Sequence, residues 1–329
     1  MNDAPLVLGL PLLHAAGRDL LSARYRVVEL EDPAQVEERL PEADALYCYP
    51  PLTVSARMIE RAGRLKVIAA AGSGVDHIDL QAAADAGIAV THAVGAGALS
   101  VAEHAIGHML CLAKRLVEID RALREGRFGP REAEAYEELS GRTLAIVGFG
   151  AIGRALARIA ARGFEMDVIA VTRSGTPVDD PNVRRTLPLR DALAAADVVS
   201  VHVPLMPSTR GLIGREELRR MKPTAWLIDT SRGGVVDSAA LHDMLVAGRL
   251  AGAGLDVFEP EPPPVDAPLL ALPNVVVSPH CAGITRAAYR RLSLSAANDI
   301  DQVLRGMRPA GLVVPPPRSP SIAHPGELP

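Results

Sequence analysis

A glycine-rich turn near the middle of the chain constrains the fold more than any other feature. Gly148, Gly150 and Gly153 form a G-x-G-x-x-G pattern between the apolar run 143–147 and a segment, 154–162, with Ala and Leu at helical spacing. The first glycine of such a turn permits a tight bend, the second lets the backbone approach a pyrophosphate, and the third lets helix pack on strand. The helix N-terminus then faces the anion. The pattern predicts a dinucleotide site.

Short apolar runs alternate with polar-faced helical segments in two series. The first series comprises 6–10, 25–28, 45–49, 67–70 and 88–90, and the second comprises 143–147, 168–171, 198–203, 225–228, 254–257 and 275–277. Such Val- and Ile-rich runs are typical of strands buried on both faces of a parallel sheet. We therefore predict an α/β chain of two doubly wound parallel-sheet domains in tandem.

The longest helical stretch, 100–125, connects the two series. Ser100 is its expected N-cap, because Glu103 follows three residues later as a capping-box partner. A last helix is expected over 286–304. From residue 309 the chain is Pro-rich and mostly lacks periodicity, so we expect a loose end.

Composition excludes several classes of protein. The 329 residues suggest two domains at about 150 residues each. The chain has 35 Lys and Arg against 39 Asp and Glu, a net charge of −4, and only 3% aromatic residues. It therefore lacks the cationic surplus and the stacking rings that nucleic-acid partners require.

Cysteine usage and hydropathy point to an intracellular, membrane-free protein. Cys48, Cys111 and Cys281 form no C-x-x-C pair, so we expect reduced, buried thiols rather than disulfides or a zinc site. No apolar run approaches the ~18 residues of a membrane-spanning helix. The apolar run 6–13 lacks a basic flank. We expect a cytoplasmic protein.

The residues after the run 168–171 bear on the choice of cofactor. An acidic residue at this point would bind the ribose 2′-hydroxyl of NAD. The chain has Thr172, Arg173 and Ser174 instead. Because a guanidinium offers a planar set of donors and a fixed positive charge, these residues favour a 2′-phosphate and hence NADP over NAD.

Three polar stretches follow later strands, at 227–234, 254–262 and 278–283. Ligands of open α/β sheets bind at the carboxyl ends of the strands. With these motifs in order behind the glycine turn, the sequence from about residue 67 to 304 resembles the D-isomer-specific 2-hydroxyacid dehydrogenase family. The resemblance implies a flavodoxin-like substrate domain of 1–101 and 283–329, a Rossmann cofactor domain of 102–282, an interdomain cleft and a homodimer.

The resemblance also implies a catalytic triad of Arg232, Glu261 and His280. A guanidinium can hold the carboxylate of a 2-keto acid and polarise the ketone. An imidazole, with its pKa near neutrality, can supply the proton that the carbonyl oxygen takes up. A carboxylate can orient that imidazole. Glu259 lies two residues from Glu261 and could be confused with it.

Further contacts are implied by the same resemblance. The expected cofactor residues, besides those of the glycine turn and the 2′-phosphate loop, are Ser100, Ile152, Val203, Pro204, Thr209, Thr230, Ser231 and Asp256. His202 is not expected to be catalytic. In the first domain, Ser73 and Gly74 belong to the loop 71–77, whose backbone N–H groups are expected to receive the substrate carboxylate.

The sequence departs from the family pattern at two positions. Gly97 and Asp229 stand where the family commonly has Asn. The first departure removes a polar contact near the expected cleft, and the second adds negative charge close to the cofactor.

His104 and His108 lie four residues apart in the long helical stretch, a spacing that could hold a metal. No third ligand is evident near them in the sequence. We expect histidines that pack the helix, and no metal.

These features predict an NAD(P)-dependent enzyme that reduces a small 2-keto acid, with glyoxylate or hydroxypyruvate favoured, to the D-2-hydroxy acid. One alternative in the same family is a D-3-phosphoglycerate dehydrogenase without a regulatory domain. Another, from a different class, is a non-catalytic dinucleotide-sensing binding protein. Formate oxidation is disfavoured, because it would not need Glu261 as an acid partner for His280.

Overall fold

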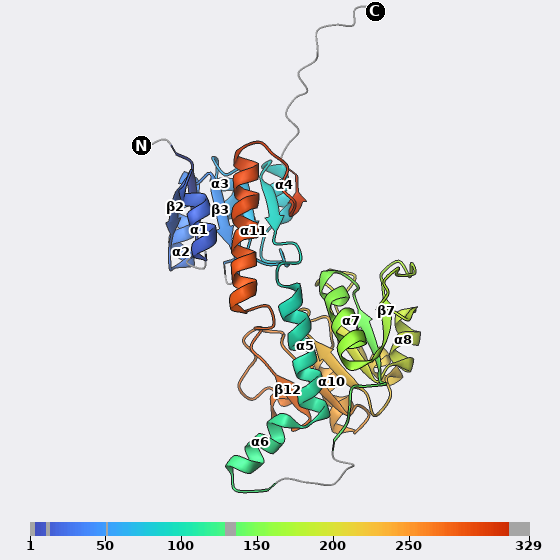
Figure 1. Cartoon of the computed structure of the whole chain (residues 1–329). Helices are drawn as coiled ribbons and strands as arrows, with labels where there is room; N and C mark the ends of the chain where they lie inside the picture. The colour runs from blue at the N-terminus through green and yellow to red at the C-terminus, as the bar shows by residue number, and fades with distance from the viewer. Residues whose placement is uncertain (1–3, 11–13, 51, 129–135, 316–329) are drawn as a thin grey trace, which may run out of the picture. The chain divides into compact units, whose positions relative to one another are not determined.

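The computed structural model describes residues 4–10, 14–50, 52–128 and 136–315. The chain divides into two compact units (Figure 1). Unit 1 contains Met1–Ala96 and Arg286–Pro329, and unit 2 contains Gly97–Thr285. The functional domain limits expected at residues 101 and 283 stay a prediction.

Unit 2 is built on seven parallel strands in the order β12-β11-β10-β9-β6-β7-β8. The strands are β6 (Thr143–Val147), β7 (Asp167–Val171), β8 (Arg185–Thr186), β9 (Val198–Val201), β10 (Trp226–Asp229), β11 (Gly252–Leu255) and β12 (Val275–Val277). Strand order reverses between β6 and β9, as in a Rossmann fold. The carboxyl ends on either side of that reversal are the place where such folds bind dinucleotides.

Helices cover both faces of this sheet. They are α5 (Ala98–Ala113), α7 (Ala151–Phe164), α8 (Leu189–Ala195), α9 (Arg215–Arg220) and α10 (Ser238–Val246), with the short helix η3 (Pro268–Ala271). A further helix, α6 (Leu116–Arg124), follows α5 at the periphery. Successive residues of β6 alternate between the faces. Leu144 and Ile146 pack with α5 and α7, whereas Ala145 and Val147 pack with α8 and α10. This two-sided burial explains why the strands appear as continuous apolar runs.

Unit 1 has a six-stranded sheet in the order β13-β5-β4-β3-β1-β2. Its elements are β1 (Leu6–Gly9), α1 (Ala15–Ser22), β2 (Arg26–Glu29), α2 (Pro33–Arg39), η1 (Leu40–Glu42), β3 (Ala45–Cys48), α3 (Ala56–Arg61), β4 (Val67–Ala70), α4 (Leu80–Asp85), β5 (Ala89–His92), α11 (Arg286–Leu304) and β13 (Leu312–Val314). The five strands before residue 96 are parallel and have a flavodoxin-like order. The predicted pair of doubly wound α/β sheets is thus confirmed.

The end of the chain differs from its expectation. β13 lies inside the segment expected to be loose, and it pairs antiparallel with β5. The sheet of unit 1 is therefore mixed rather than purely parallel. Residues 316–329, the rest of the expected loose end, lie outside the described residues.

The predicted helix 100–125 is two helices. α5 begins at Ala98, and its N-cap is Gly97, which makes no side-chain capping bond. The prediction that Ser100 caps the helix is therefore wrong, and its hydroxyl instead lies 2.9 Å from that of Thr285. The helix breaks at Arg115, whose φ of 49° is left-handed.

Two smaller expectations can be compared with the structure. Cys48, Cys111 and Cys281 are free cysteines, of which Cys48 is buried and the other two are half-buried. Among the described residues, no helix combines the length and the apolar character needed to cross a membrane.

Candidate active site

The glycine turn has the geometry of an anion cradle. Gly148 follows β6 with φ of 97°, and a Cβ there would lie 2.8 Å from the carbonyl of His202. A Cβ on Gly153 would lie 2.6 Å from the carbonyl oxygen of Gly148. Gly150 is the N-cap of α7 and has no side chain to accept from the first-turn N–H groups, so these donors are open to a ligand. These residues fit the pyrophosphate of a dinucleotide.

The loop after β7 carries the predicted 2′-phosphate residues. The N–H of Gly175 donates to the carbonyl of Thr172 at 3.2 Å, and the N–H of Thr176 donates to Ser174 Oγ at 3.3 Å, which closes a tight turn. Arg173 is exposed on this turn. In the part of the chain that the structure describes, no acidic side chain pairs with it. Its charge is available to an anion.

His280 and Glu261 form a close pair after β12 and β11. His280 Nδ1 lies 2.7 Å from Glu261 Oε2, with side-chain exposures of 42% and 36%. The other oxygen of Glu261 accepts from the N–H of Phe258 at 2.9 Å. Because the carboxylate accepts the Nδ1 proton, Nε2 is the ring nitrogen left to exchange a proton with a ligand.

The structure distinguishes Glu261 from its neighbour Glu259. Both carboxylate oxygens of Glu259 accept from Nη1 of Arg210, at 2.8 and 2.9 Å. Glu259 therefore has its own cationic partner, and Glu261 is the acid beside His280.

Arg232 lies in the loop after β10. It is half-buried, and its Nη1 donates to the carbonyl of Ser231 at 2.8 Å. The next residue, Gly233, packs so closely on the carbonyl of Phe258 that a Cβ there would collide with it. The Arg232 loop and the Glu261 loop thus meet backbone to backbone. The structure brings Glu261 into contact with His280, and joins Arg232 to them through this packing.

Asp229 ends β10 beneath the Arg232 loop. It is 3% exposed, and its Oδ1 accepts from both the N–H and the Oγ of Ser231, at 2.9 and 2.6 Å. Burial raises the pKa of Asp229 to about 6, and the nearby Asp256 acts in the same direction. The carboxyl holds the first turn of the loop that carries Arg232.

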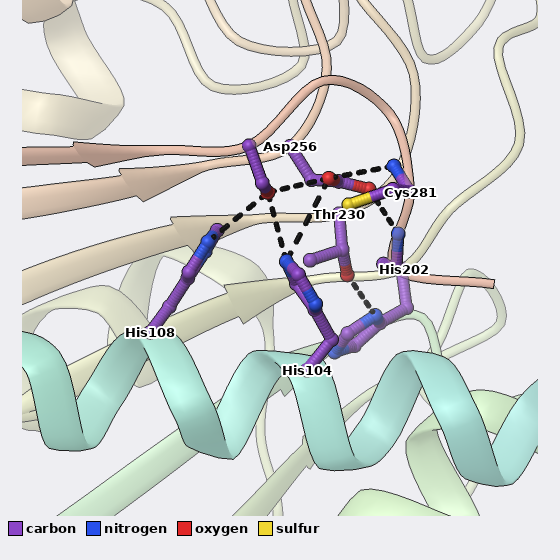
Figure 2. A network of polar contacts seen from close by, with 8 residues as sticks. His104, His108, His202, Thr230, Asp256 and Cys281 are labelled. Atoms are coloured by element: carbon purple, nitrogen blue, oxygen red, sulfur yellow. Dashed lines mark hydrogen bonds and ion pairs between the residues drawn. The ribbon is translucent and has the colours of Figure 1, made fainter. Parts of the chain in front are cut away.

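A second buried carboxyl, Asp256, follows β11 (Figure 2). It bonds with the segment Ser278–Ala282, and Ser278 in turn contacts His104 and His108 of α5. The sequence predicts a cofactor contact for Asp256 but no role for Ser278. The spacing of the two histidines was the available signal, although it does not identify their partner.

The possible metal ligands in the structure differ from the pair of histidines considered in the sequence. His104, Asp256 and Cys281 present possible ligand atoms within 4.8 Å of one another, whereas His108 is outside this set. In the structure these polar atoms bond mainly within the network itself, with Ser278 between His104 and Asp256.

His202 and Thr209 organise the loop after β9. Burial lowers the pKa of His202 to about 3, so its ring is neutral. The ring lies 2.8 Å from Ser200 Oγ and 3.2 Å from Thr230 Oγ1, which it can orient (Figure 2). The Thr209 hydroxyl donates to the carbonyl of Pro204 at 2.6 Å. Val203 packs beside Gly148, where a Cβ would lie 2.9 Å from it.

In unit 1 the loop 71–77 is anchored at several points. The N–H of Ala71 donates to the Cys48 carbonyl at 2.8 Å, and the Ser73 carbonyl lies 2.9 Å from His92 Nδ1. Within the described residues, the N–H groups of Ser73 and Gly74 have no acceptor. The loop therefore presents backbone donors of the kind that bind a carboxylate.

The Rossmann topology, the open glycine turn and the imidazole–carboxylate pair at the strand ends define a nicotinamide-dinucleotide-dependent oxidoreductase. Comparison with known proteins narrows this class. Residues 106–282 match the family model described as D-isomer specific 2-hydroxyacid dehydrogenase, NAD binding domain. The chain belongs to the D-isomer-specific 2-hydroxyacid dehydrogenase family.

Individual relatives have different substrates in their names. The chain is 40% identical over 281 residues to a glyoxylate reductase of Korarchaeum cryptofilum, covering 84% of each protein. It is 38% identical over 269 residues to a D-3-phosphoglycerate dehydrogenase of Archaeoglobus fulgidus, covering 82% of this chain but 51% of that protein. The chain thus spans about half the length of that relative.

A solved structure shows the same fold over nearly the whole chain. It is the NADPH-dependent glyoxylate/hydroxypyruvate reductase of Sinorhizobium meliloti in complex with NADP and malonate. The TM-score is 0.84 at 29% identity, and the match covers 96% of this chain and 100% of that one.

Proposed function

We propose that this enzyme reduces a small 2-keto acid, with glyoxylate or hydroxypyruvate favoured, to the D-2-hydroxy acid, and that it prefers NADPH. The observation that carries the proposal is the 2.7 Å contact between His280 Nδ1 and Glu261 Oε2. This contact occupies Nδ1 and leaves Nε2 of His280 to transfer a proton at the carboxyl end of the sheet, where such folds bind dinucleotides.

Each residue has a distinct task in this proposal. The glycine turn of Gly148, Gly150 and Gly153 would hold the dinucleotide, which would supply the hydride that reduces the ketone carbon. His280 Nε2 gives its proton to the carbonyl oxygen as that oxygen gains negative charge, so the product is a hydroxyl group. Glu261 stabilises the imidazolium before this transfer and fixes the ring. Arg232 holds the substrate carboxylate through its fork of donors and polarises the ketone.

The loop 71–77 of unit 1 is proposed to bind a substrate carboxylate through its backbone. The support is the pair of donors at Ser73 and Gly74, which have no acceptor in the described protein. Backbone donors of this kind favour 2-keto acids as a class, because they address the carboxylate that all of these compounds share.

The proposed preference for NADPH rests on Arg173, which is exposed beside Ser174 without an acidic partner among the described residues. We expect Arg173→Ala to raise the KM for NADPH about tenfold or more while changing that for NADH little, because a charged hydrogen bond to phosphate is lost. Initial rates with both cofactors measure this. Arg158→Ala, on the solvent side of α7, is the control. Equal losses with both cofactors would refute the 2′-phosphate assignment.

The reaction itself is tested by mixing the protein with NADPH and either glyoxylate or hydroxypyruvate and following absorbance at the nicotinamide band. We expect turnover that His280→Ala abolishes. His242→Ala is the matched control, since His242 lies in α10 and pairs with Asp243. Turnover that survives His280→Ala would remove this residue from the proposed role.

Two alternatives have separate outcomes in the same assay. The 38% identity to a D-3-phosphoglycerate dehydrogenase favours a trial with 3-phosphoglycerate and the oxidised cofactor. Oxidation of this compound at a higher kcat/KM than reduction of either keto acid would select a phosphoglycerate dehydrogenase without a regulatory domain. Cofactor binding with no turnover on any keto acid would select a dinucleotide-sensing protein.

A homodimer is also proposed, on the family resemblance and on an apolar surface of α6. Leu116, Val117 and Leu123 are 44%, 48% and 60% exposed on this helix. Figure 1 shows α6 at the periphery of unit 2. Exposed apolar side chains gathered on one helix favour a protein partner, and we assign this surface to a second copy of the chain.

A further inference from the structure

One buried carboxyl holds the turn that carries His280 from both sides. Asp256 is 1% exposed. Its Oδ1 accepts from Ser278 Oγ at 2.5 Å and from the N–H of Cys281 at 2.9 Å, while its Oδ2 accepts from the N–H of Ala282 at 2.9 Å (Figure 2). His280 lies between these three anchor points. Its position is therefore set by bonds before and after it in the chain.

The backbone of His280 needs such support. Its φ of 51° is in the left-handed region, which a residue with a Cβ adopts at an energetic cost. Such a conformation persists where surrounding contacts determine it, and it is found most often at functional sites. Glycine would relieve the cost but would remove the imidazole. The bonds to Asp256 are the contacts that hold this turn.

The hydroxyl of Ser278 connects this carboxyl to α5. It has one hydrogen, which it donates to Asp256 at 2.5 Å. Its lone pairs then accept from His104 Nε2 at 2.8 Å and from His108 Nε2 at 3.2 Å. Figure 2 shows the rings of His104 and His108 projecting from their helix toward Asp256. Two histidine donors thus orient the one hydrogen of Ser278 toward Asp256.

His108 is suited to this task by burial. Burial lowers the pKa of His108 to about 4, with His104 acting in the same direction, so the ring is neutral at pH 7 and carries one N–H. Because the one hydrogen of Ser278 goes to Asp256, the 3.2 Å contact between Ser278 Oγ and His108 Nε2 assigns the hydrogen of the neutral ring to Nε2. The ring also packs on Gly254, where a Cβ would lie 2.7 Å from that of His108. Helix and strand are fixed together at this point.

We propose that Ser278, His104 and His108 are positioning residues for His280, and that they act through Asp256 on the turn 278–282. The two histidines serve as hydrogen-bond donors. This inference rests on the proposed function only because the proposed function makes His280 the proton donor.

A pair of substitutions at His108 tests the proposal by kinetics. His108→Leu removes the donor, and we expect kcat to fall about tenfold because the imidazole is less well placed, while the KM for the keto acid changes less than twofold. His108→Gln restores an N–H donor at a similar reach and should recover most of kcat. An unchanged kcat in His108→Leu, or a Gln variant as slow as the Leu variant, would overturn the proposal.

A spectroscopic measurement tests the same proposal without turnover. In protein labelled with ¹⁵N-histidine, the Nδ1–H of His280 bonded to Glu261 should give a deshielded proton resonance, assigned by its loss in His280→Ala. Ser278→Ala should broaden or remove this resonance, whereas Ser238→Ala, an exposed serine at the start of α10, should leave it intact. Circular dichroism establishes that both variants are folded.

The outcomes separate this inference from the proposed function. A wild-type protein without turnover, whose His280 resonance still depends on Ser278, would refute the proposed reaction and support the positioning network. A wild-type enzyme whose resonance and kcat are both unchanged in Ser278→Ala would support the reaction and refute the network. Absence of the resonance from the folded wild-type protein would also refute it.

Discussion

Two buried carboxyls at neighbouring strand ends hold the two loops that bear the proposed catalytic side chains. Asp229 ends β10 and bonds to Ser231 in the Arg232 loop, and Asp256 follows β11 and bonds to the turn around His280. Each carboxyl satisfies backbone N–H groups that would otherwise lack an acceptor. A short acidic side chain is therefore used here to hold a loop.

The raised pKa of Asp229 has a consequence for stability. Burial disfavours the ionised form of Asp229, so the folded protein loses stability when this carboxyl ionises. Its contribution to the unfolding free energy is fully present below about pH 4 and is lost as pH rises through about 6. Asp229→Asn cannot ionise. We expect it to stabilise the protein at pH 8 by up to about 3 kcal/mol, with the gain fading toward pH 4.

Urea unfolding at several pH values measures this difference. Asp243→Asn is the control of opposite sign, because the Arg215 partner lowers the pKa of Asp243. If the gain in unfolding free energy of Asp229→Asn does not vary with pH, burial does not raise the pKa of Asp229 as proposed.

At the same scale, Arg232→Lys tests the proposed guanidinium clamp. An ammonium is a point charge and cannot bind a carboxylate through two parallel N–H bonds. We expect kcat/KM for the keto acid to fall about a hundredfold, since one of the two parallel N–H bonds to the substrate is lost. Steady-state kinetics measure this, and a variant with wild-type kcat/KM would remove Arg232 from the mechanism.

At the scale of elements, the packing of Gly233 on Phe258 joins two loops. Gly233→Ala puts a Cβ against the Phe258 carbonyl, and backbone cannot move aside as a flexible side chain can. We expect a loss of about 1–3 kcal/mol of unfolding free energy, as in other overpacked sites, together with a lower kcat.

Gly163 offers a matched control in the last turn of α7. A Cβ there meets nothing within 4 Å, so Gly163→Ala should stabilise the protein by about 0.5–1 kcal/mol. Equal stability of the two variants, measured by thermal unfolding, would contradict the close packing of the loops.

Much of the element order follows from the sequence, because strands buried on both faces leave continuous apolar runs. The break at Arg115 has no such signal, since neither Gly nor Pro lies there and the residue takes φ of 49°. β13 was missed because three residues at a sheet edge acquire their conformation from a distant partner, β5.

The candidate site shows the same limit. The glycine turn and the three strand-end stretches are local patterns, and they were found. The family resemblance assigns the acid to Glu261, but residue chemistry alone does not separate Glu261 from Glu259, since the two acids lie two residues apart. Their partners, Arg210 and His280, distinguish them. The contact between His108 and Ser278 joins residues 170 positions apart, which no local pattern reveals.

For the whole molecule, the apolar surface of α6 predicts the oligomeric state. Leu123 is 60% exposed on this helix, and a charge there would have to be buried in a dimer. We expect light scattering to give twice the 34.7 kDa chain mass for the wild type and a single chain mass for Leu123→Asp. Val246→Asp, at an exposed site of 63% on α10, is the control. A monomeric wild type would refute the dimer.

The composition of unit 1 from both ends of the chain determines when it can form during synthesis. Its sheet face includes Ala45 and Val67, which are covered by Ala296, Ala297 and Ile300 of α11, the helix that follows the whole of unit 2. A nascent polypeptide that has left the ribosome only as far as residue 285 has every strand of the Rossmann sheet, but it lacks this covering helix. Unit 2 is thus the first that can complete its core, and the N-terminal strands must wait until α11 has been synthesised.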